Sequence, residues 1–334
     1  MLEGKKVLIT GGTGSLGKAL TKRLLEMNVE AIRILSRNEE KQISMETEFN
    51  DKRIRYFLGD IRDLSRLERA FEDIDVVFHA AALKHVPKIE YNPFEAVKTN
   101  VIGSQNVIDA SLKQNVDKVI AIGTDKAVSP FNTYGATKLL MEKLFVDAAN
   151  YVNPQKHRTK FVALRYGNVL GSSGSVIPKF IEQIKKGKKI TVTDPKMTRF
   201  SITMNEALDF IIDSTQIGVG SEVIIPKLKA YTITDIKNVL FELIQNTGEN
   251  IIGIREGEKL HELLISEYEI RNGWEIDNKY ILTNQAHEEL ITKTYPENLK
   301  HIKNTKEYSS EFAEKMNNRE LKSVLQESLL LENI

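Results

Sequence analysis

Short apolar runs alternate with longer segments of helical periodicity through the first half of the chain. The apolar runs cover residues 5–10, 31–35, 53–58, 75–79, 116–123 and 161–166. Helical patterns follow several of them, reaching residue 27 after the first run and covering 133–150 after the fifth. Repeated β–α units predict an α/β fold with a parallel sheet, right-handed crossovers and a ligand crevice at the carboxyl ends of the strands.

The pattern changes after Tyr166. A loop rich in glycine and serine at 167–175 precedes helical patterns at 176–186 and 205–217. From about residue 272 the chain is polar and weakly patterned. We expect residues 310–331 to be helix-like, because a leucine stripe there suits packing against the body or a neighbouring subunit.

The first apolar run ends in a glycine-rich turn. Residues 11–17 read GGTGSLG, so Gly11, Gly14 and Gly17 have the spacing G-x-x-G-x-x-G. Between a strand and a helix, such a turn lets backbone amides approach a pyrophosphate closely. The spacing predicts a dinucleotide site in an NAD(P)-binding Rossmann fold with a doubly wound parallel sheet.

The ends of later runs suggest further cofactor contacts. The second run ends in Ser36 and Arg37, where an acidic residue would bind the ribose 2′-hydroxyl of NAD, whereas arginine suits a 2′-phosphate. We therefore predict NADP, although Arg37 as a solvated loop charge is the alternative. Asp60 is placed to meet the adenine, and the small Ala80 and Ala82 let the backbone pass close to the cofactor.

These features suggest a division of the chain. Residues 1–166 are expected to form the NADP-binding Rossmann domain, with a segment at about 199–225 returning to it. Residues 167–290 are expected to form most of a smaller, interleaved substrate-binding domain. Residues 291–334 form a C-terminal tail without an assigned role.

Residues 119–138 concentrate the acid and base chemistry. An apolar run ends in Thr124, Asp125 and Lys126, and Tyr134 and Lys138 follow at the start of a helical pattern. The i, i+4 spacing puts phenol and ammonium on one helix face, where the cation can stabilise a phenolate, so tyrosine becomes a plausible base. Tyr-x-x-x-Lys also occurs by chance in surface helices, but its position here favours catalysis.

Cationic side chains elsewhere are candidate anion ligands. Arg199 and Arg255 are expected to clamp a diphosphate, because arginine offers paired hydrogen bonds and a fixed charge, although a surface role is the alternative for each. Lys84 could reach the cofactor or the substrate.

Composition narrows the class of protein. Apolar residues make up 41% and charged residues 28%, as in globular chains. The net charge of +1 gives no electrostatic case for nucleic acid or an anionic membrane, and the absence of cysteine excludes disulfides, thiolate nucleophiles and Cys-ligated zinc. No metal site and no apolar run long enough to span a membrane are predicted. We expect a cytoplasmic homo-oligomer, from dimer to hexamer.

Several segments together carry a resemblance to a known family. They are TGGTGSLG at 10–17, TDKA at 124–127, YGATK at 134–138, RYGNVLGS at 165–172, MTRF at 197–200 and REGEKLHE at 255–262. The chain resembles extended short-chain dehydrogenases/reductases and, more narrowly, the inverting UDP-N-acetylglucosamine 4,6-dehydratases that open pseudaminic acid biosynthesis. The resemblance covers roughly residues 1–290, and Thr-Asp-Lys with GEKLHE is its most specific part.

The resemblance implies a set of ligand contacts. NADP contacts are implied at Thr13, Gly14, Ser15, Leu16, Arg37, Asp60, Ile61, Ala80, Lys84, Tyr134 and Lys138. Substrate contacts with UDP-N-acetylglucosamine are implied at Asn168, Arg199, Arg255 and Glu258, besides Lys84.

The implied reaction begins with oxidation at C4. Tyr134, assisted by Lys138 and Thr124, takes the proton of the sugar 4-hydroxyl while the hydride passes to NADP. Lys126 removes the acidified C5 hydrogen and Asp125 protonates the departing 6-hydroxyl. The hydride then returns to C6, and a proton on the opposite face inverts C5, giving UDP-2-acetamido-2,6-dideoxy-β-L-arabino-hex-4-ulose.

This hypothesis makes two structural demands. Burial and nearby positive charges are expected to lower the pKa of Lys126, so that it can act as a base. The backbone must also bend at residues 124–126, because consecutive strand side chains point apart. The alternatives are a nucleotide-sugar 4-epimerase, which needs no acid/base pair at Asp125 and Lys126, and a non-catalytic, NADP-sensing scaffold.

Overall fold

A large, mostly parallel sheet runs through the centre of the computed structural model, which describes residues 2–153, 155–171, 175–255, 257–295, 298–303 and 305–327. Within these residues the sheet has ten strands in the order β16-β14-β15-β10-β6-β5-β4-β1-β2-β3. The seven strands from β3 to β10 are parallel to one another, and β15, β14 and β16 are antiparallel additions. The strands are β1 (Lys6–Thr10), β2 (Ala31–Ser36), β3 (Ile54–Leu58), β4 (Val76–His79), β5 (Lys118–Ile122), β6 (Lys160–Leu164), β10 (Glu222–Pro226), β14 (Gly273–Ile276), β15 (Lys279–Thr283) and β16 (Lys300–His301).

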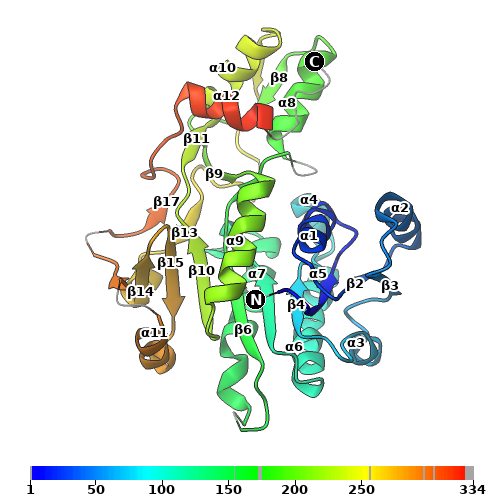
Figure 1. The fold of residues 1–334 in the computed structure, drawn as a ribbon. Coiled ribbons are helices and arrows are strands. Elements are labelled where there is room, and N and C mark those ends of the chain that lie inside the picture. The colour runs from blue at the N-terminus through cyan, green and yellow to red at the C-terminus, as the bar shows by residue number, and fades with distance from the viewer. Residues whose placement is uncertain are drawn as a thin grey trace.

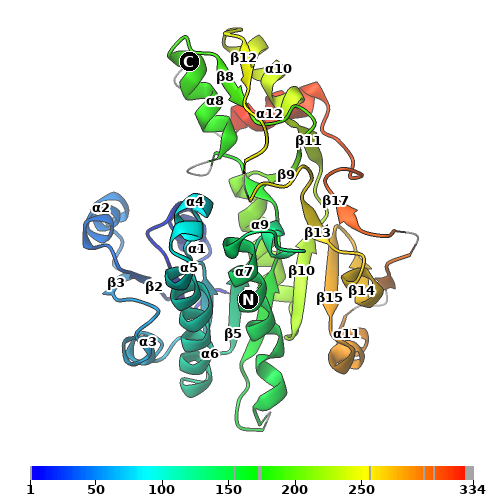
Figure 2. The same ribbon diagram turned by 180° about the vertical axis from the view of Figure 1, so that it is seen from behind.

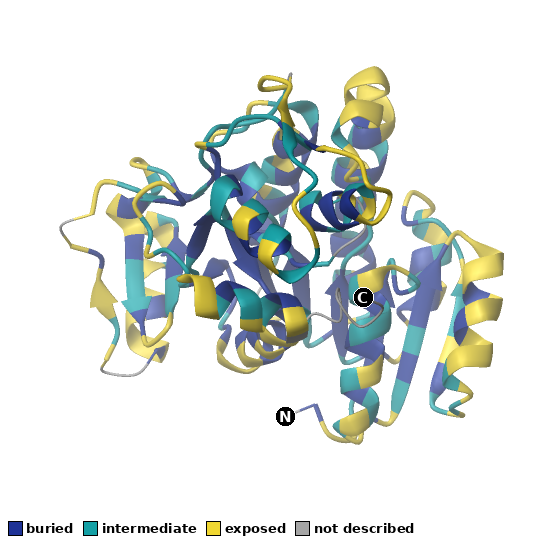
Figure 3. Cartoon of the chain, turned by 90° about the horizontal axis from the view of Figure 1, so that it is seen from above, coloured by how far each residue is buried: buried dark blue, intermediate teal, exposed yellow. Residues whose placement is uncertain are grey.

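Helices cover both faces of this sheet (Figures 1 and 2). One face packs against α1, α2 and α9, and the other against α3, α6 and α7. The central strands are apolar because both of their faces are buried, and Figure 3 shows them dark blue between helices whose outer sides are exposed. The helices are α1 (Ser15–Glu26), α2 (Glu39–Phe49), α3 (Leu64–Ala70), α4 (Val86–Tyr91), α5 (Pro93–Ala96), η1 (Val97–Ile102), α6 (Gly103–Lys113), α7 (Thr133–Asp147), η3 (Ala148–Tyr151) and α9 (Met204–Ile217).

A smaller lobe has its own apolar core beside the large sheet (top of Figure 1). It contains α8 (Val176–Lys185), β8 (Ile190–Val192), α10 (Ile233–Leu243), β12 (Glu249–Ile251) and α12 (Asn318–Glu327). A short sheet of β7 (Asn168–Val169), β9 (Thr198–Ile202) and β11 (Ala230–Thr232) connects it to the large sheet's region. Thr232 and Asp235 form a capping box that fixes the start of α10.

The doubly wound α/β fold expected from the sequence is confirmed. The domain boundaries stay predictions. β10 of the large sheet lies at the segment expected to return to the Rossmann domain, whereas β14 and β15 lie within residues 167–290 and β16 lies beyond residue 290.

The later part of the chain contains strands that were not predicted, and one expectation there is wrong. The weakly patterned residues 273–283 form β14 and β15 and pair antiparallel with the edge of the sheet. Residues 310–317 are not helical, and α12 begins only at Asn318. The preceding strand β17 (Tyr308–Ser309) pairs with β13 (Leu263–Ile265). Residues 328–331 of the expected helix, and 172–174 of the glycine- and serine-rich loop, lie outside the described residues.

A buried ion cluster joins α7 to the segment after β13. The Arg165 guanidinium is fully buried, and it donates to both carboxylate oxygens of Glu142 on α7 and to the carbonyl oxygen of Leu264 at 2.9 Å. It also donates to Glu269 in the turn η4 (Glu269–Asn272) at 2.8 and 3.1 Å. Because these contacts occupy the guanidinium on several sides, the cluster holds three distant segments in register.

Arg165→Met should lower the free energy of unfolding by about 3–5 kcal/mol, because it leaves the buried carboxylate of Glu142 without the guanidinium that binds both of its oxygens. Urea unfolding followed by circular dichroism would measure the change. Arg158→Met is the matched control, since Arg158 is 70% exposed and pairs with Asp117 at 2.7 Å on the surface. Equal effects of both substitutions would show that the cluster adds no special stability.

Candidate active site

A cleft of about 870 Å³ lies between the carboxyl ends of the parallel strands and the small lobe. Residues that follow β1, β2, β3, β4, β5 and β6 line one side, and residues of α8 and the start of α10 line the other. The cleft wall includes these residues expected to be functional: Gly11, Thr13, Gly14, Ser15, Leu16, Gly17, Ser36, Arg37, Asp60, Ile61, Ala80, Ala82, Lys84, Thr124, Lys126, Tyr134, Lys138, Asn168, Arg199, Arg255 and Glu258. Asp125 does not line the cleft. The catalytic and binding roles of all these residues stay predictions.

The turn after β1 leaves space and amide groups for an anion. Gly11 has φ +68°, and a Cβ there would lie 2.8 Å from the Cα of Ala81. A Cβ on Gly17 would overlap the carbonyl oxygen of Gly12. The N-cap of α1 is Gly14, which offers no side-chain cap, and the first turn carries no acidic residue. The N-terminus of α1 therefore suits a phosphate group.

Positive charge predominates at the end of β2. Arg37 lies at the cleft, with its Nη1 3.6 Å from Oδ2 of Asp60. Arg62 donates to the same carboxylate at 2.7 and 2.9 Å, and these hydrogen bonds outweigh burial, so that the pKa of Asp60 is lowered. Since Arg62 already binds the carboxylate closely, Arg37 keeps donors for another anion.

The turn after β5 carries the predicted acid and base. The 3-10 turn η2 (Asp125–Ala127) follows the strand, so the bend expected at residues 124–126 is present. The Lys126 ammonium donates to Asp125 Oδ1 at 3.0 Å and to Asn168 Oδ1 at 3.2 Å. Asp125 itself is fully buried behind the cleft wall, and its Oδ2 has no hydrogen-bond partner within the described residues.

The pKa of Lys126 is raised, whereas the sequence predicted a lowered pKa, so that prediction is wrong. Burial does lower it, but the negative charges of Asp125 and Glu262 have the larger combined effect. The missed cause is Glu262, whose carboxylate comes from a distant segment of the chain. In this arrangement Lys126 is an ammonium held by carboxylates.

Tyr134 and Lys138 lie in the first turns of α7, where Asn132 caps the helix by accepting the Gly135 amide at 2.8 Å. Burial raises the pKa of Tyr134, while Lys126 and a hydrogen bond with Thr124 act to lower it. The positive charge that acts to lower the pKa of Tyr134 is thus that of Lys126, whereas the sequence predicted Lys138 for this part. Lys138 donates to the carbonyl of Ile122 at 2.6 Å, and burial lowers its pKa to about 7, against the opposing charge of Glu142.

The two arginines expected to bind a diphosphate, Arg199 and Arg255, differ in how many of their N–H donors are already engaged. Most Arg199 donors are engaged, with the carbonyl oxygens of Thr198 at 2.7 Å, Leu260 at 3.1 Å and Lys259 at 3.0 Å. Arg199 therefore mainly anchors the segment around residue 260. Arg255 is about half exposed at the cleft, and within the described residues its one ion pair is a 3.7 Å contact between its Nη1 and Oε1 of Glu258.

Sequence reasoning missed several cleft residues. Lys179 of α8 lines the cleft near Arg255, and burial lowers its pKa. Lys259 donates to the Val128 carbonyl at 2.6 Å, and Asn132 donates to the Gly257 carbonyl at 2.8 Å, so the segment 257–262 is fixed to the loop before α7. The REGEKLHE sequence was the available signal, although it did not indicate which residue faces which partner.

Fold and site together describe a Rossmann-type α/β protein with acid/base groups beside a nucleotide cleft. Residues 7–284 match the model of a family described as polysaccharide biosynthesis protein, and the chain belongs to this family.

Several known proteins are similar to the chain. A UDP-N-acetylglucosamine 4,6-dehydratase (inverting) of Campylobacter jejuni is 49% identical over 285 residues, 85% of this chain and 84% of the relative. A UDP-glucose 4-epimerase of Rickettsia massiliae is 38% identical over 330 residues, 97% of this chain and 96% of the relative. The crystal structure of Pen from Bacillus thuringiensis has a TM-score of 0.91 at 40% identity, covering 99% of this chain and 100% of the other.

A protein of Methanocaldococcus jannaschii named as an uncharacterized membrane protein is 45% identical over 332 residues, 97% of this chain and 96% of the relative. Among the residues that the structure describes here, no helix is both long and apolar enough to cross a membrane.

The lowered pKa of Lys138 predicts a pH dependence of stability. Between about pH 7 and 10 the unfolded chain binds a proton on this lysine that the folded protein does not, so folded stability rises with pH across this window. The free energy of unfolding of wild type relative to Lys138→Met should rise by up to about 1.4 kcal/mol per pH unit. Urea titrations across the window would measure it, with Lys143→Met, exposed on the same helix, as control. Parallel curves for wild type and Lys138→Met would contradict the assignment.

Proposed function

We propose that this chain is an NADP-dependent UDP-N-acetylglucosamine 4,6-dehydratase that inverts C5, an early step toward pseudaminic acid or a related surface sugar. The observation that carries the proposal is the Lys126–Asp125 pair at the end of β5, beside Tyr134 in the cleft wall. Elimination of water needs one group to remove a proton and another to protonate the leaving hydroxyl, and this pair supplies both types. The Campylobacter jejuni relative, which is 49% identical over 285 residues, carries this activity in its name.

The cofactor half of the cleft fits a dinucleotide. The glycine turn before α1 suits the pyrophosphate, and Arg37 suits a 2′-phosphate since Arg62 already neutralises Asp60. Bound NADP would accept the C4 hydride and return it to C6. The oligomeric state and the cytoplasmic location remain predictions.

The protein's own groups move the protons. Tyr134, hydrogen-bonded to Thr124, is placed to take the proton of the 4-hydroxyl. Lys126 can remove the C5 proton once its ammonium has given up a proton. Proton transfer from Lys126 to Asp125 would leave a neutral amine and a carboxylic acid, which is the state that elimination requires. The number of protons bound to the pair would not change.

Asp125 fits its proposed role less directly than Lys126. Its carboxylate lies behind the cleft wall, so it would reach the leaving hydroxyl only through Lys126 or Thr124, whose hydroxyl donates to Asp125 Oδ1 at 2.9 Å. We therefore assign Asp125 as the proton store of the pair, and Lys126 as the group that faces the sugar.

A UDP-sugar 4-epimerase is the second candidate, and it is supported by the Rickettsia relatives that align along nearly the full chain. An epimerase uses the same cofactor half and Tyr134, but needs no proton transfer at C5. A non-catalytic scaffold is the least supported alternative, because Thr124, Lys126, Tyr134 and Lys138 all remain in the cleft wall.

Incubation with UDP-N-acetylglucosamine and NADP in deuterium oxide should give a 4-keto-6-deoxy sugar nucleotide with deuterium at C5, because the C5 proton exchanges with solvent during elimination. Proton NMR of the product would show the loss of the H5 signal and the new C6 methyl group. Lys126→Ala should abolish the product while leaving NADPH binding intact, measured by fluorescence. Formation of the 4-epimer alone would favour the epimerase, and unchanged substrate would reject both enzymes.

Arg37→Glu should weaken NADPH binding roughly ten- to hundredfold, because the 2′-phosphate loses a charge-assisted hydrogen bond. NADH binding should be unchanged or stronger, because a carboxylate at this position can accept a hydrogen bond from the ribose 2′-hydroxyl. Titration calorimetry with both cofactors measures the two effects. Arg69→Glu makes the same charge change on an exposed part of α3 and should alter neither affinity. Equal losses for NADPH and NADH in the Arg37 variant would speak against 2′-phosphate recognition.

A further inference from the structure

Glu262 is a buried carboxylate at the cleft without an assigned role. It directly precedes β13, its side chain is 5% exposed, and it forms part of the cleft wall. Its Oε2 is buried and has no hydrogen-bond partner within the described residues. An unpaired buried carboxylate oxygen is costly, and such groups persist mainly where function requires them.

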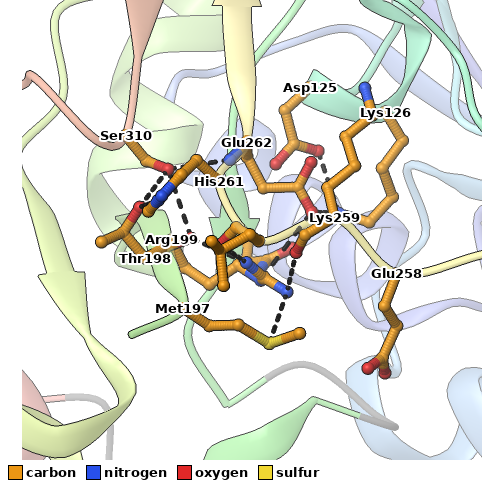
Figure 4. Close-up of polar contacts among 12 residues, drawn as sticks. Asp125, Lys126, Met197, Thr198, Arg199, Glu258, Lys259, His261, Glu262 and Ser310 are labelled. Carbon is orange, nitrogen blue, oxygen red and sulfur yellow. Dashed lines mark hydrogen bonds and ion pairs between the residues drawn. The ribbon is translucent and has the colours of Figure 1, made fainter. Parts of the chain in front are cut away.

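The Glu262 carboxylate faces two cations (Figure 4). Its Oε1 lies 3.8 Å from Lys126 Nζ and 3.8 Å from Arg199 Nε. The Nη atoms of Arg199 donate to backbone carbonyl oxygens. Arg199 therefore does not form the paired, bidentate hydrogen bonds with Glu262 that are usual between arginine and a carboxylate. Lys126 is therefore shared between Asp125 on one side and Glu262 on another.

Other charged and titratable groups also surround this contact, and they come from several elements. They are Asp125 of η2, Tyr134 of α7, Arg199 of β9, Tyr231 of β11 and Lys259 of the segment before β13. Arg199 and Lys259 oppose the effect of Glu262 on Lys126, whereas Asp125 reinforces it.

The backbone at Glu262 is fixed by the C-terminal part of the chain. The Glu262 amide donates to Ser310 Oγ at 2.8 Å, and the Ser310 amide donates to the Glu262 carbonyl at 2.8 Å. The Ser310 hydroxyl also contacts Thr198 Oγ1 at 2.7 Å. These contacts continue the pairing of β13 with β17, so the side chain enters the cleft from a rigid support.

We propose that Glu262 is a positioning residue that acts through Lys126: with Asp125 it holds the ammonium from two sides and so decides when this amine is free to act as a base. The inference rests on the proposed function, in which Lys126 takes the C5 proton. Proton transfer from Lys126 to Asp125, its hydrogen-bond partner at 3.0 Å, breaks one N–H bond and forms one O–H bond. The amine then accepts the C5 proton, the Asp125 proton passes through Thr124 or Lys126 to the departing hydroxyl, and both groups return to their starting state.

The test measures the protonation of Lys126 without substrate. Trace acetylation with acetic anhydride labels only neutral amines, and mass spectrometry of the peptide containing Lys126 gives the labelling midpoint as a function of pH. Glu262→Gln should lower the labelling midpoint by about one pH unit, because the amine loses one negative charge that faces it. At a fixed pH well below the midpoint, the labelling of Lys126 should therefore increase about tenfold. Glu262→Asp keeps the charge and should move it much less.

Glu311→Gln is the matched control. It removes the same charge one residue after Ser310, where Glu311 faces His261 at 3.8 Å and not Lys126, so the midpoint should stay at its wild-type value. The pH profile of turnover provides a second readout: the ascending limb should shift to lower pH in Glu262→Gln, with KM nearly unchanged.

An unchanged midpoint in Glu262→Gln would overturn the proposal whatever the activity of the variant, and so would an equal shift in Glu262→Asp. If wild type forms no dehydrated product but the midpoint shifts as expected, the proposed function fails while the coupling of Glu262 to Lys126 stands. If Glu262→Gln does not fold, Glu262→Ala replaces it as the variant without the charge: a lowered midpoint supports the proposal and a wild-type midpoint overturns it.

Discussion

The close approach of three backbone segments around the turn after β5 is the constraint on which the site depends. A Cβ on Gly123 would overlap the carbonyl oxygen of Leu164 at the end of β6, and a Cβ on Gly135 would overlap the carbonyl oxygen of Lys126. Hydrogen bonds from the Gly123 amide to Leu164 at 2.6 Å and from the Asp125 amide to Tyr166 at 3.1 Å hold the turn against its neighbour. Two glycines thus let the turn, β6 and α7 meet, and Lys126 and Tyr134 meet with them.

The two lysines of the site have opposite electrostatic surroundings. Lys126 faces two carboxylates that outweigh the effect of burial. Lys138 is buried, and among the described residues Glu142 is the one carboxylate that favours its charge. Arg165 binds that Glu142 through both carboxylate oxygens. The buried ion cluster therefore does more than join segments, since it limits how strongly Glu142 can hold a proton on Lys138. One lysine remains an ammonium, and the other is close to neutrality at physiological pH.

The sequence predicted the fold and the cleft well because their signals are local. An apolar run followed by a glycine turn or an acid/base pair lies within a few residues, and parallel topology brings the ends of such runs to one edge. The hidden position of Asp125, the engaged donors of Arg199 and the raised pKa of Lys126 depend on contacts across the chain. Glu262 lies 136 positions after Lys126 in the sequence, at a separation that no periodic pattern reports.

The C-terminal segment is a second case in which packing between distant residues could not be predicted from the sequence. Residues 308–310 carry no recognisable motif, yet β17 completes a two-stranded sheet with β13 and Ser310 binds the backbone on both sides of the Glu262 peptide unit. A strand of two residues has too little intrinsic preference to be predicted, and it exists here because β13 offers an unpaired edge. The site therefore depends on the tail for the placement of a carboxylate that the cofactor-binding half of the chain cannot supply.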